Sequence, residues 1–296
     1  MAADNDGFVD WVGPGVQADR YYTHGFRFQG VVEWKASGAG VLSTESLPVC
    51  HEEPDERGCF LTRLILGHAI YTPGYLFDEV PASDDRPYAG WLYGDVMVGK
   101  VRADRITALG LQVGVTGPPS FASPVHRWFH RTLGKEEPRG WDHQLPFEPA
   151  FSLRFQSRQS FPLLGRVGEI FFGVAPDVTV TAGTLRSGVA AGLSLEGGWN
   201  APSTLDWLGP GLDGPYVLVR LGAEGEFVLR DLFLDGSLWR EGPSVDRSPG
   251  FGSLKGGVQV GVRRFGIEVA AVRSMPEFQN QLDSHTYGII RLVFRH

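Results

Sequence analysis

The feature that most constrains this chain is an alternation of residue types with a period of two along many short segments. Between residues 105 and 116, the bulky side chains of Leu109, Leu111, Val113 and Val115 alternate with small or polar residues. Successive side chains of a strand point to opposite faces, so this pattern predicts strands with one apolar face. The same alternation recurs in residues 23–36, 149–156, 216–227, 254–263 and 286–294.

The second face of these segments indicates what kind of sheet they form. It carries small and charged residues, and glycine is abundant, at 40 of 296 residues. A polar lumen and a lipid-facing band produce this pattern, and glycine makes room where a lumen is crowded. About a dozen segments of about ten residues fit tilted strands that span a membrane. We predict an all-β, transmembrane, antiparallel up-and-down β-barrel, one domain over residues 1–296. A soluble β-sandwich is the alternative.

One segment, residues 123–134, is expected to be helical and to form a short insertion in the barrel. It opens with Ser123 before Pro124 and ends at Gly134. These residue types are typical of the two ends of a helix.

Composition and the two cysteines restrict the possible cellular compartments and the possible classes of partner. The net charge of −7 argues against a nucleic acid as the main partner. The first residues contain no signal peptide, and no run of residues is apolar enough for a transmembrane helix. Cys50 and Cys59 flank an acidic loop that contains proline and glycine, which favours a disulfide in an oxidising compartment over two unrelated thiols.

Few residues suggest chemistry by themselves. His126 and His130 are four residues apart on the expected helix and share a face, and Glu136 follows shortly after it. Two surface histidines would give the same spacing, and a zinc site would need His143 as a third ligand. Asn5 and the adjacent aspartate offer oxygen ligands of the type that calcium prefers, or form an ordinary polar segment.

Common nucleophile and phosphate-binding motifs are absent from the sequence. It contains no Gly-x-Ser-x-Gly motif, no P-loop and no dinucleotide-binding fingerprint. A hydrolase with this sequence would therefore activate a water molecule rather than a recognised serine nucleophile.

A set of motifs, taken in order, nevertheless resembles one known family, the outer-membrane lipid A 3'-O-deacylases of Gram-negative bacteria. The motifs are Asn5-Asp6, residues 19–25, 70–73, 85–91, 114–118, 130–134, 140–145, 231–236 and 277–281. Each motif alone has little specificity, but together they cover nearly the whole chain.

The resemblance implies a fold, a place and an activity. The fold would be a barrel of 12 strands in the outer membrane. The activity would be calcium-dependent hydrolysis of the ester-linked acyl chain at the 3' position of lipid A. The implied partners are lipopolysaccharide as substrate and the surrounding outer-membrane lipids, with no obligate protein partner.

The resemblance also implies roles for individual residues. His130 would be the general base that activates water, and Glu136 would orient His130 or bind calcium. Asn5 and Thr23 would be catalytic groups that position the substrate by hydrogen bonds. Asp6 and Glu136 would be metal ligands, and the calcium ion would stabilise the oxyanion.

The sequence departs from the family pattern at several places. His126 stands where a family member has glutamine, and it is a candidate substrate-binding residue. Acidic Asp78 falls where that member has a lysine. The chain also ends two residues beyond Phe294, the terminal aromatic residue that outer-membrane assembly signals usually show.

Two alternative functions use the same scaffold. The first is a catalytically silent outer-membrane barrel, acting as a pore or a structural protein. The second is a phospholipase-type esterase, which would use the same chemistry on a glycerophospholipid.

Overall fold

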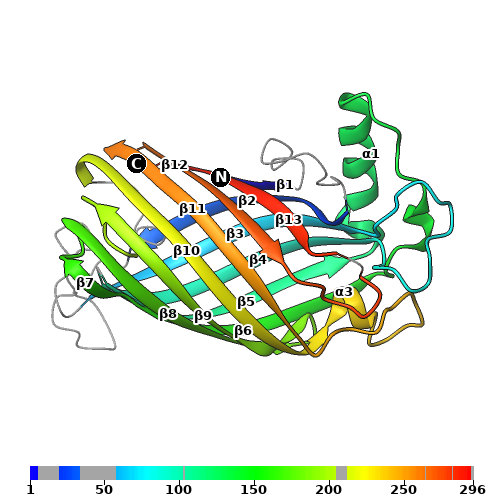
Figure 1. Ribbon diagram of the computed structural model, residues 1–296. Helices are drawn as coiled ribbons and strands as arrows, with labels where there is room; N and C mark the ends of the chain where they lie inside the picture. The colour runs from blue at the N-terminus through cyan, green and yellow to red at the C-terminus, as the bar shows by residue number, and fades with distance from the viewer. Residues whose placement is uncertain are drawn as a thin grey trace, which may run out of the picture.

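The structure of the protein is a computed structural model, which shows a barrel of antiparallel strands with a short helix standing at one end (Figure 1). It describes residues 1–5, 20–33, 58–102, 104–204, 212–263, 265–281 and 283–294. The strands are β1 (Ala2–Asn5), β2 (Tyr21–Glu33), β3 (Cys59–Thr72), β4 (Ala89–Val101), β5 (Arg105–Thr116), β6 (Glu148–Gln159), β7 (Phe161–Gly165), β8 (Ile170–Gly183), β9 (Arg186–Trp199), β10 (Leu212–Asp231), β11 (Gly250–Arg263), β12 (Phe265–Ser274) and β13 (His285–Phe294). The helices are α1 (Ala122–Thr132) and α3 (Leu232–Asp235).

Two pairings close the sheet into a barrel. Strand β1 lies between β2 and β13, so the beginning and the end of the chain are joined in one sheet. On the other side, β6 pairs with β8. A closed sheet has no unpaired edge, which is the condition for a sheet that crosses a lipid bilayer.

The barrel has twelve strands, because β6 and β7 together form one of them. Both run antiparallel to β8, and the pair Phe161 and Val174 continues the register of the pair Arg158 and Asp177. Ser160, between β6 and β7, is only a local interruption. Among the described residues this gives the 12-strand up-and-down barrel that was predicted.

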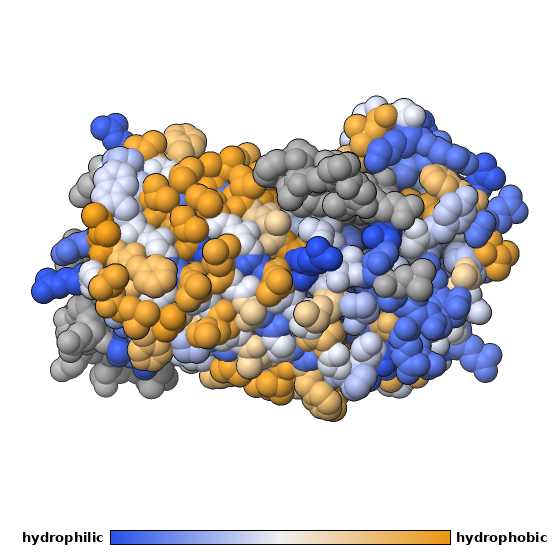
Figure 2. Space-filling view, in the orientation of Figure 1, coloured by the Kyte–Doolittle hydropathy of each residue, from blue (hydrophilic) through white to orange (hydrophobic). Residues whose placement is uncertain are grey.

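The two faces of the strands separate as the alternation predicts. Leu109, Leu111 and Val113 of β5 are exposed on the outside, and Leu109 has 61% of its surface accessible. In Figure 2, apolar side chains cover much of the barrel wall, and polar side chains gather at the end that carries α1. We call this the helix end. A soluble sandwich would bury its apolar face, so the exposed apolar band excludes that alternative.

At the end opposite the helix end, a buried carboxylate holds the lumen together. Glu196 of β9 is fully buried and accepts hydrogen bonds from Arg158, Ser160 and Ser203. Ser203 belongs to the segment after β9, and its carbonyl accepts hydrogen bonds from Arg158 and Arg220. This segment is therefore folded inward against the lumen.

At the helix end, α3 reaches across the mouth of the barrel. The Asp231 carboxylate caps α3 by accepting a hydrogen bond from the Phe233 amide, at 2.9 Å. Phe233 stacks on Tyr71 of β3, with ring centroids 4.3 Å apart, and contacts Trp91 of β4. Because β3 and β4 lie opposite β10 in the strand order, α3 spans the lumen.

The expected helix is present as α1, but its start differs from the prediction. Ser123 does not cap it: α1 begins at Ala122, Ser123 lies in the first turn, and no side chain makes a capping hydrogen bond. A 3₁₀ turn over Pro118–Ser120 leads into α1 through Phe121, which has a left-handed backbone. Gly134 ends the helical region with a φ of 67°, as its place predicted.

No helix within the described ranges is long and apolar enough to cross a membrane.

We expect Glu196→Gln to destabilise the barrel by about 3 kcal/mol, because it leaves Arg158 and Arg220 beside a buried group without charge. The free energy of unfolding in urea, followed by tryptophan fluorescence in detergent, measures this. Glu241→Gln, at an exposed glutamate, is the matched control and should have no effect. Equal stability of the two variants would show that the network contributes little.

Candidate active site

Helix α1 stands at the helix end of the barrel (Figure 1), where it contacts β3 and β4. Its first residue, Ala122, is buried in a cluster with Ile70, Tyr88 and Trp141. Gly90 of β4 allows this close approach, because a Cβ atom there would overlap the side chains of Ser120 and Ala122. The absence of a side chain at Gly90 therefore fixes where α1 begins.

The buried face of α1 carries both histidines predicted from the sequence. His126 and His130 are each only 1% exposed, while Trp128 on the opposite side is 60% exposed. Their rings meet edge to face, with centroids 4.6 Å apart. The structure thus excludes the interpretation of these residues as two surface histidines.

His130 is oriented by the backbone of Glu136. The Nδ1 atom of His130 lies 2.6 Å from the Glu136 carbonyl oxygen. A carbonyl can only accept, so Nδ1 carries a proton, and Nε2 is the ring nitrogen left to act as a base. The left-handed turn at Gly134 brings the chain back to make this contact.

The side chain of Glu136 points elsewhere. Its carboxylate is about half exposed and accepts a hydrogen bond from Arg139, at 2.8 Å. Glu136 was predicted to orient His130 or to bind a metal. The structure shows a contact that orients His130, and this contact is made by the backbone of Glu136 and not by its carboxylate.

His126 is held by a tryptophan that the sequence analysis did not single out as a site residue. Trp141, in a 3₁₀ turn over Gly140–His143, donates from Nε1 to the Nδ1 atom of His126, at 3.2 Å. Burial, and then the neighbouring His130 and His24, hold the pKa of His126 well below its usual range. His126 is therefore neutral at physiological pH.

Strand β2 brings Thr23 and a further histidine to the site. Thr23 sits at a register shift between Tyr22 and His24, and its buried hydroxyl is 2.7 Å from the Thr72 hydroxyl. His24 is buried, and its ring centroid lies 5.3 Å from that of Phe129 on α1. In the sequence, His24 was visible only as one member of the apolar face of a strand.

The closing strand β1 carries Asn5 to the same place. Asn5 pairs with His24 in the β1–β2 ladder and with Gly288 of β13. Asn5, Thr23 and His130 are thus brought to one region between β1, β2 and α1. Asp6 lies outside the described residues, so its predicted part in metal binding stays a prediction.

The predicted metal ligands do not form a cluster of acidic or histidine side chains within the described ranges. No group of three or more His, Cys, Asp or Glu side chains within the described ranges could hold a metal ion. The Glu136 carboxylate faces Arg139 instead. Asp78 is exposed in the loop between β3 and β4.

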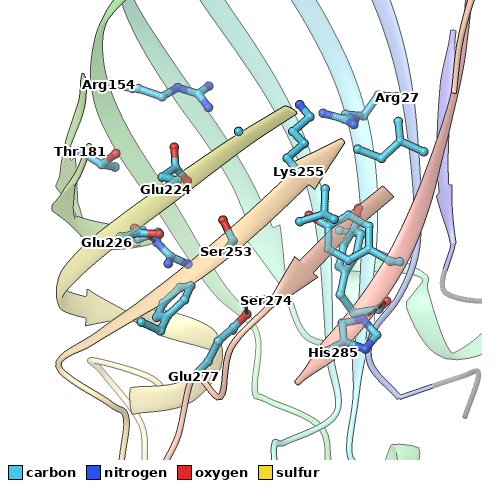
Figure 3. Close-up of a pocket in the computed structure, with 18 of the residues that line it drawn as sticks. Arg27, Arg154, Thr181, Glu224, Glu226, Ser253, Lys255, Ser274, Glu277 and His285 are labelled. Atoms are coloured by element: carbon cyan, nitrogen blue, oxygen red, sulfur yellow. Dashed lines mark hydrogen bonds and ion pairs between the residues drawn. The ribbon is translucent and has the colours of Figure 1, made fainter. Parts of the chain in front are cut away.

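A separate cavity of about 700 Å³ lies inside the barrel. Figure 3 shows Arg154, Glu224 and Lys255 on its wall. None of the described candidate residues Thr23, His126, His130 and Glu136 lines this cavity. The candidate site therefore lies on the outside of the barrel and not in its lumen.

A comparison with known protein families decides the identity of this barrel. Residues 1–296 match the model of a family described as outer membrane protein LpxR. The chain belongs to the LpxR family. It is an outer-membrane protein, as the resemblance implied.

A solved LpxR structure has the same fold as this LpxR-family barrel. It is LpxR from Salmonella typhimurium, with a TM-score of 0.79 and 17% sequence identity, and the match covers 100% of this chain and 98% of that chain. At this identity the similarity shows the fold. A search of curated proteins gave no match.

The disulfide between Cys50 and Cys59 of this LpxR-family protein stays a prediction. Cys59 is buried at the start of β3. Cys50 lies outside the described residues, as do the last two residues of the chain.

We expect the neutral, buried His126 to make the protein less stable in acid. Its pKa is lowered on folding, so its contribution is fully present above pH 6.5, the usual histidine value, and is lost as the pH falls below it. Between pH 7.5 and 5.5, the free energy of unfolding of the wild type should fall by about 1 kcal/mol more than that of His126→Gln. Urea unfolding at both pH values measures this, and equal losses would contradict it.

Proposed function

We propose that this protein is a lipid A deacylase of the outer membrane that hydrolyses the ester-linked 3'-acyl chain of its substrate. The family match and the shared barrel fold support a deacylase-type protein. The observation that carries the proposal is the buried His130, whose Nδ1–H donates to the Glu136 carbonyl and leaves the Nε2 lone pair as a base.

The position of His130 suits a lipid substrate. His24, Phe26 and Phe28 alternate along one face of β2, and Phe28 is exposed on the outside of the barrel. Leu66, paired with Phe28 across the ladder, is also exposed there. An apolar wall thus leads from the lipid phase to α1, and an acyl chain can reach the site while still embedded in lipid.

Hydrolysis at this site needs one base and one water molecule. The Nε2 atom of His130 takes a proton from water as the water oxygen bonds to the ester carbonyl carbon. The tetrahedral intermediate then collapses, and the bond between the carbonyl carbon and the sugar oxygen breaks. The same Nε2 returns its proton to the sugar oxygen. The products are a fatty acid and a sugar hydroxyl.

Thr23 and Asn5 are proposed to position the substrate beside His130. Thr23 is buried on β2, and its hydroxyl already contacts Thr72. Asn5 lies one ladder pair away, opposite His24. Groups fixed in strands suit positioning, because their backbone is held on both sides by neighbouring strands.

Calcium dependence is part of the proposal and rests on the resemblance, with Asp6 and Glu136 as the proposed ligands. When bound, calcium would polarise the ester carbonyl. Asp6 lies outside the described residues, so the proposal for the ion rests on the resemblance alone. Chelation should remove activity, and added calcium should restore it.

The alternatives differ from this proposal in measurable ways. A pore is disfavoured because α3 spans one mouth of the barrel and the segment around Ser203 folds into the other end. A phospholipase-type esterase would use the same base on a different substrate, so a glycerophospholipid assay separates the two activities.

We expect His130→Gln to lower the rate of lipid A deacylation by about a thousandfold, because glutamine cannot act as a base. Mass spectrometry of lipid A from cells that express each protein measures the loss of the 3'-acyl chain. His143→Gln, at an exposed histidine, is the control and should act like the wild type. Full activity of His130→Gln, or an unchanged lipid A pattern with the wild type, would refute the proposal.

For Glu136→Gln we expect the calcium requirement to rise, because Glu136 is a proposed ligand, and kcat at saturating calcium to fall by less than about fivefold, because the orienting contact to His130 comes from the backbone. The measurement is kcat over a series of calcium concentrations after chelation. An unchanged calcium requirement would rule out the Glu136 carboxylate as a ligand, and a hundredfold loss of kcat at saturating calcium would contradict orientation of His130 by the backbone alone.

A further inference from the structure

His126 and His130, neighbours on one face of α1, are fixed in opposite tautomers. The indole N–H of Trp141 can only donate, so the Nδ1 atom of His126 must accept and its Nε2 atom carries the proton. In His130 the Nδ1 atom donates to the Glu136 carbonyl, and Nε2 carries the lone pair. One ring therefore presents a donor and the other a base.

Trp141 is held firmly enough to set the tautomer of His126. It is 1% exposed, and its ring packs on Tyr88 with centroids 4.8 Å apart. A Cβ atom on the preceding Gly140 would come within 2.6 Å of the Tyr88 ring, so this glycine lets the turn sit close to it. Trp141 therefore has little freedom to turn away from His126.

In the part of the chain that the structure describes, no acceptor uses the N–H donor of His126. Its Nε2 atom is buried and has no hydrogen-bond partner among the described residues. Buried polar atoms are nearly always paired, and an orphan beside a candidate base points to a bond made only when substrate is bound.

Resting on the proposed function, we propose that the Nε2–H of His126 is a catalytic hydrogen-bond donor to the carbonyl oxygen of the scissile ester, and that Trp141 is the positioning residue that keeps it a donor. As water attacks the carbonyl carbon, the carbonyl π electrons move onto the oxygen. The Nε2–H group stabilises this negative charge without giving up its proton. His130 alone moves the proton.

Substitutions at His126 test the donor. His126→Leu keeps the approximate size of the side chain but has no donor, and it should lower kcat by about a hundredfold to a thousandfold, with KM changed by less than about threefold. His126→Gln restores an N–H donor and should recover kcat to within about tenfold of the wild type. Retained kcat in His126→Leu, or equal loss in the two folded variants, would overturn the proposal.

Trp141→Phe tests the positioning residue, because it keeps an aromatic ring and removes only the N–H. It should lower kcat by about tenfold, and Trp128→Phe, at the exposed tryptophan of the same helix, is the control. ¹⁵N NMR of histidine-labelled protein in detergent micelles should show the Nε2–H tautomer for His126 in the wild type and a mixture in Trp141→Phe. A wild-type Nδ1–H tautomer would overturn the proposal.

The NMR measurement also separates two kinds of failure. A wild-type protein that does not deacylate lipid A would overturn the proposed function and the catalytic role of His126 with it. The Nε2–H tautomer seen in such a protein would locate the error in the proposed function and not in the geometry.

Discussion

Closure of the sheet is the constraint on which the rest of this structure depends. Inside a bilayer, every backbone N–H and C=O group needs a partner within the protein, and a sheet supplies one for each only when its two edges meet. Here the edges meet through β1, which lies between β2 and β13, and through the β6–β8 pairing. Once the sheet is closed, one face must meet lipid and the other must fill a lumen, which accounts for the alternation along the strands.

The barrel could be predicted from the sequence because the two faces of its strands produce a repeat of residue types with a period of two. Leu109 and Leu111 point outward for the same reason that Gly110 points inward, and this rule needs no knowledge of distant residues. The number of strands came from the resemblance to a family, since alternation alone gives only about a dozen. The continuous register of β6 and β7 across Ser160 then makes the count of twelve exact.

The candidate site was predictable only in part. The four-residue spacing placed His126 and His130 on one face of a helix, and the buried face of α1 confirms it. The contacts that define their chemistry come from a carbonyl group and from a tryptophan 15 positions along the chain. Every residue has the same backbone carbonyl, so the sequence could not indicate that the carbonyl of Glu136 orients His130. It suggested the side-chain carboxylate of Glu136 for that role instead. The hydrogen bond from Trp141 to His126 depends on how the loop after α1 folds back. No periodic pattern in the sequence encodes the path of that loop.

Strand β1 gives the closure of the barrel a second consequence. It completes the sheet, and it also carries Asn5 to its place opposite His24. The groups proposed to handle the substrate are therefore assembled only when the first and last parts of the chain have found each other. An incompletely assembled barrel would lack Asn5 in this position, so under the proposed function its activity would depend on completed closure of the sheet.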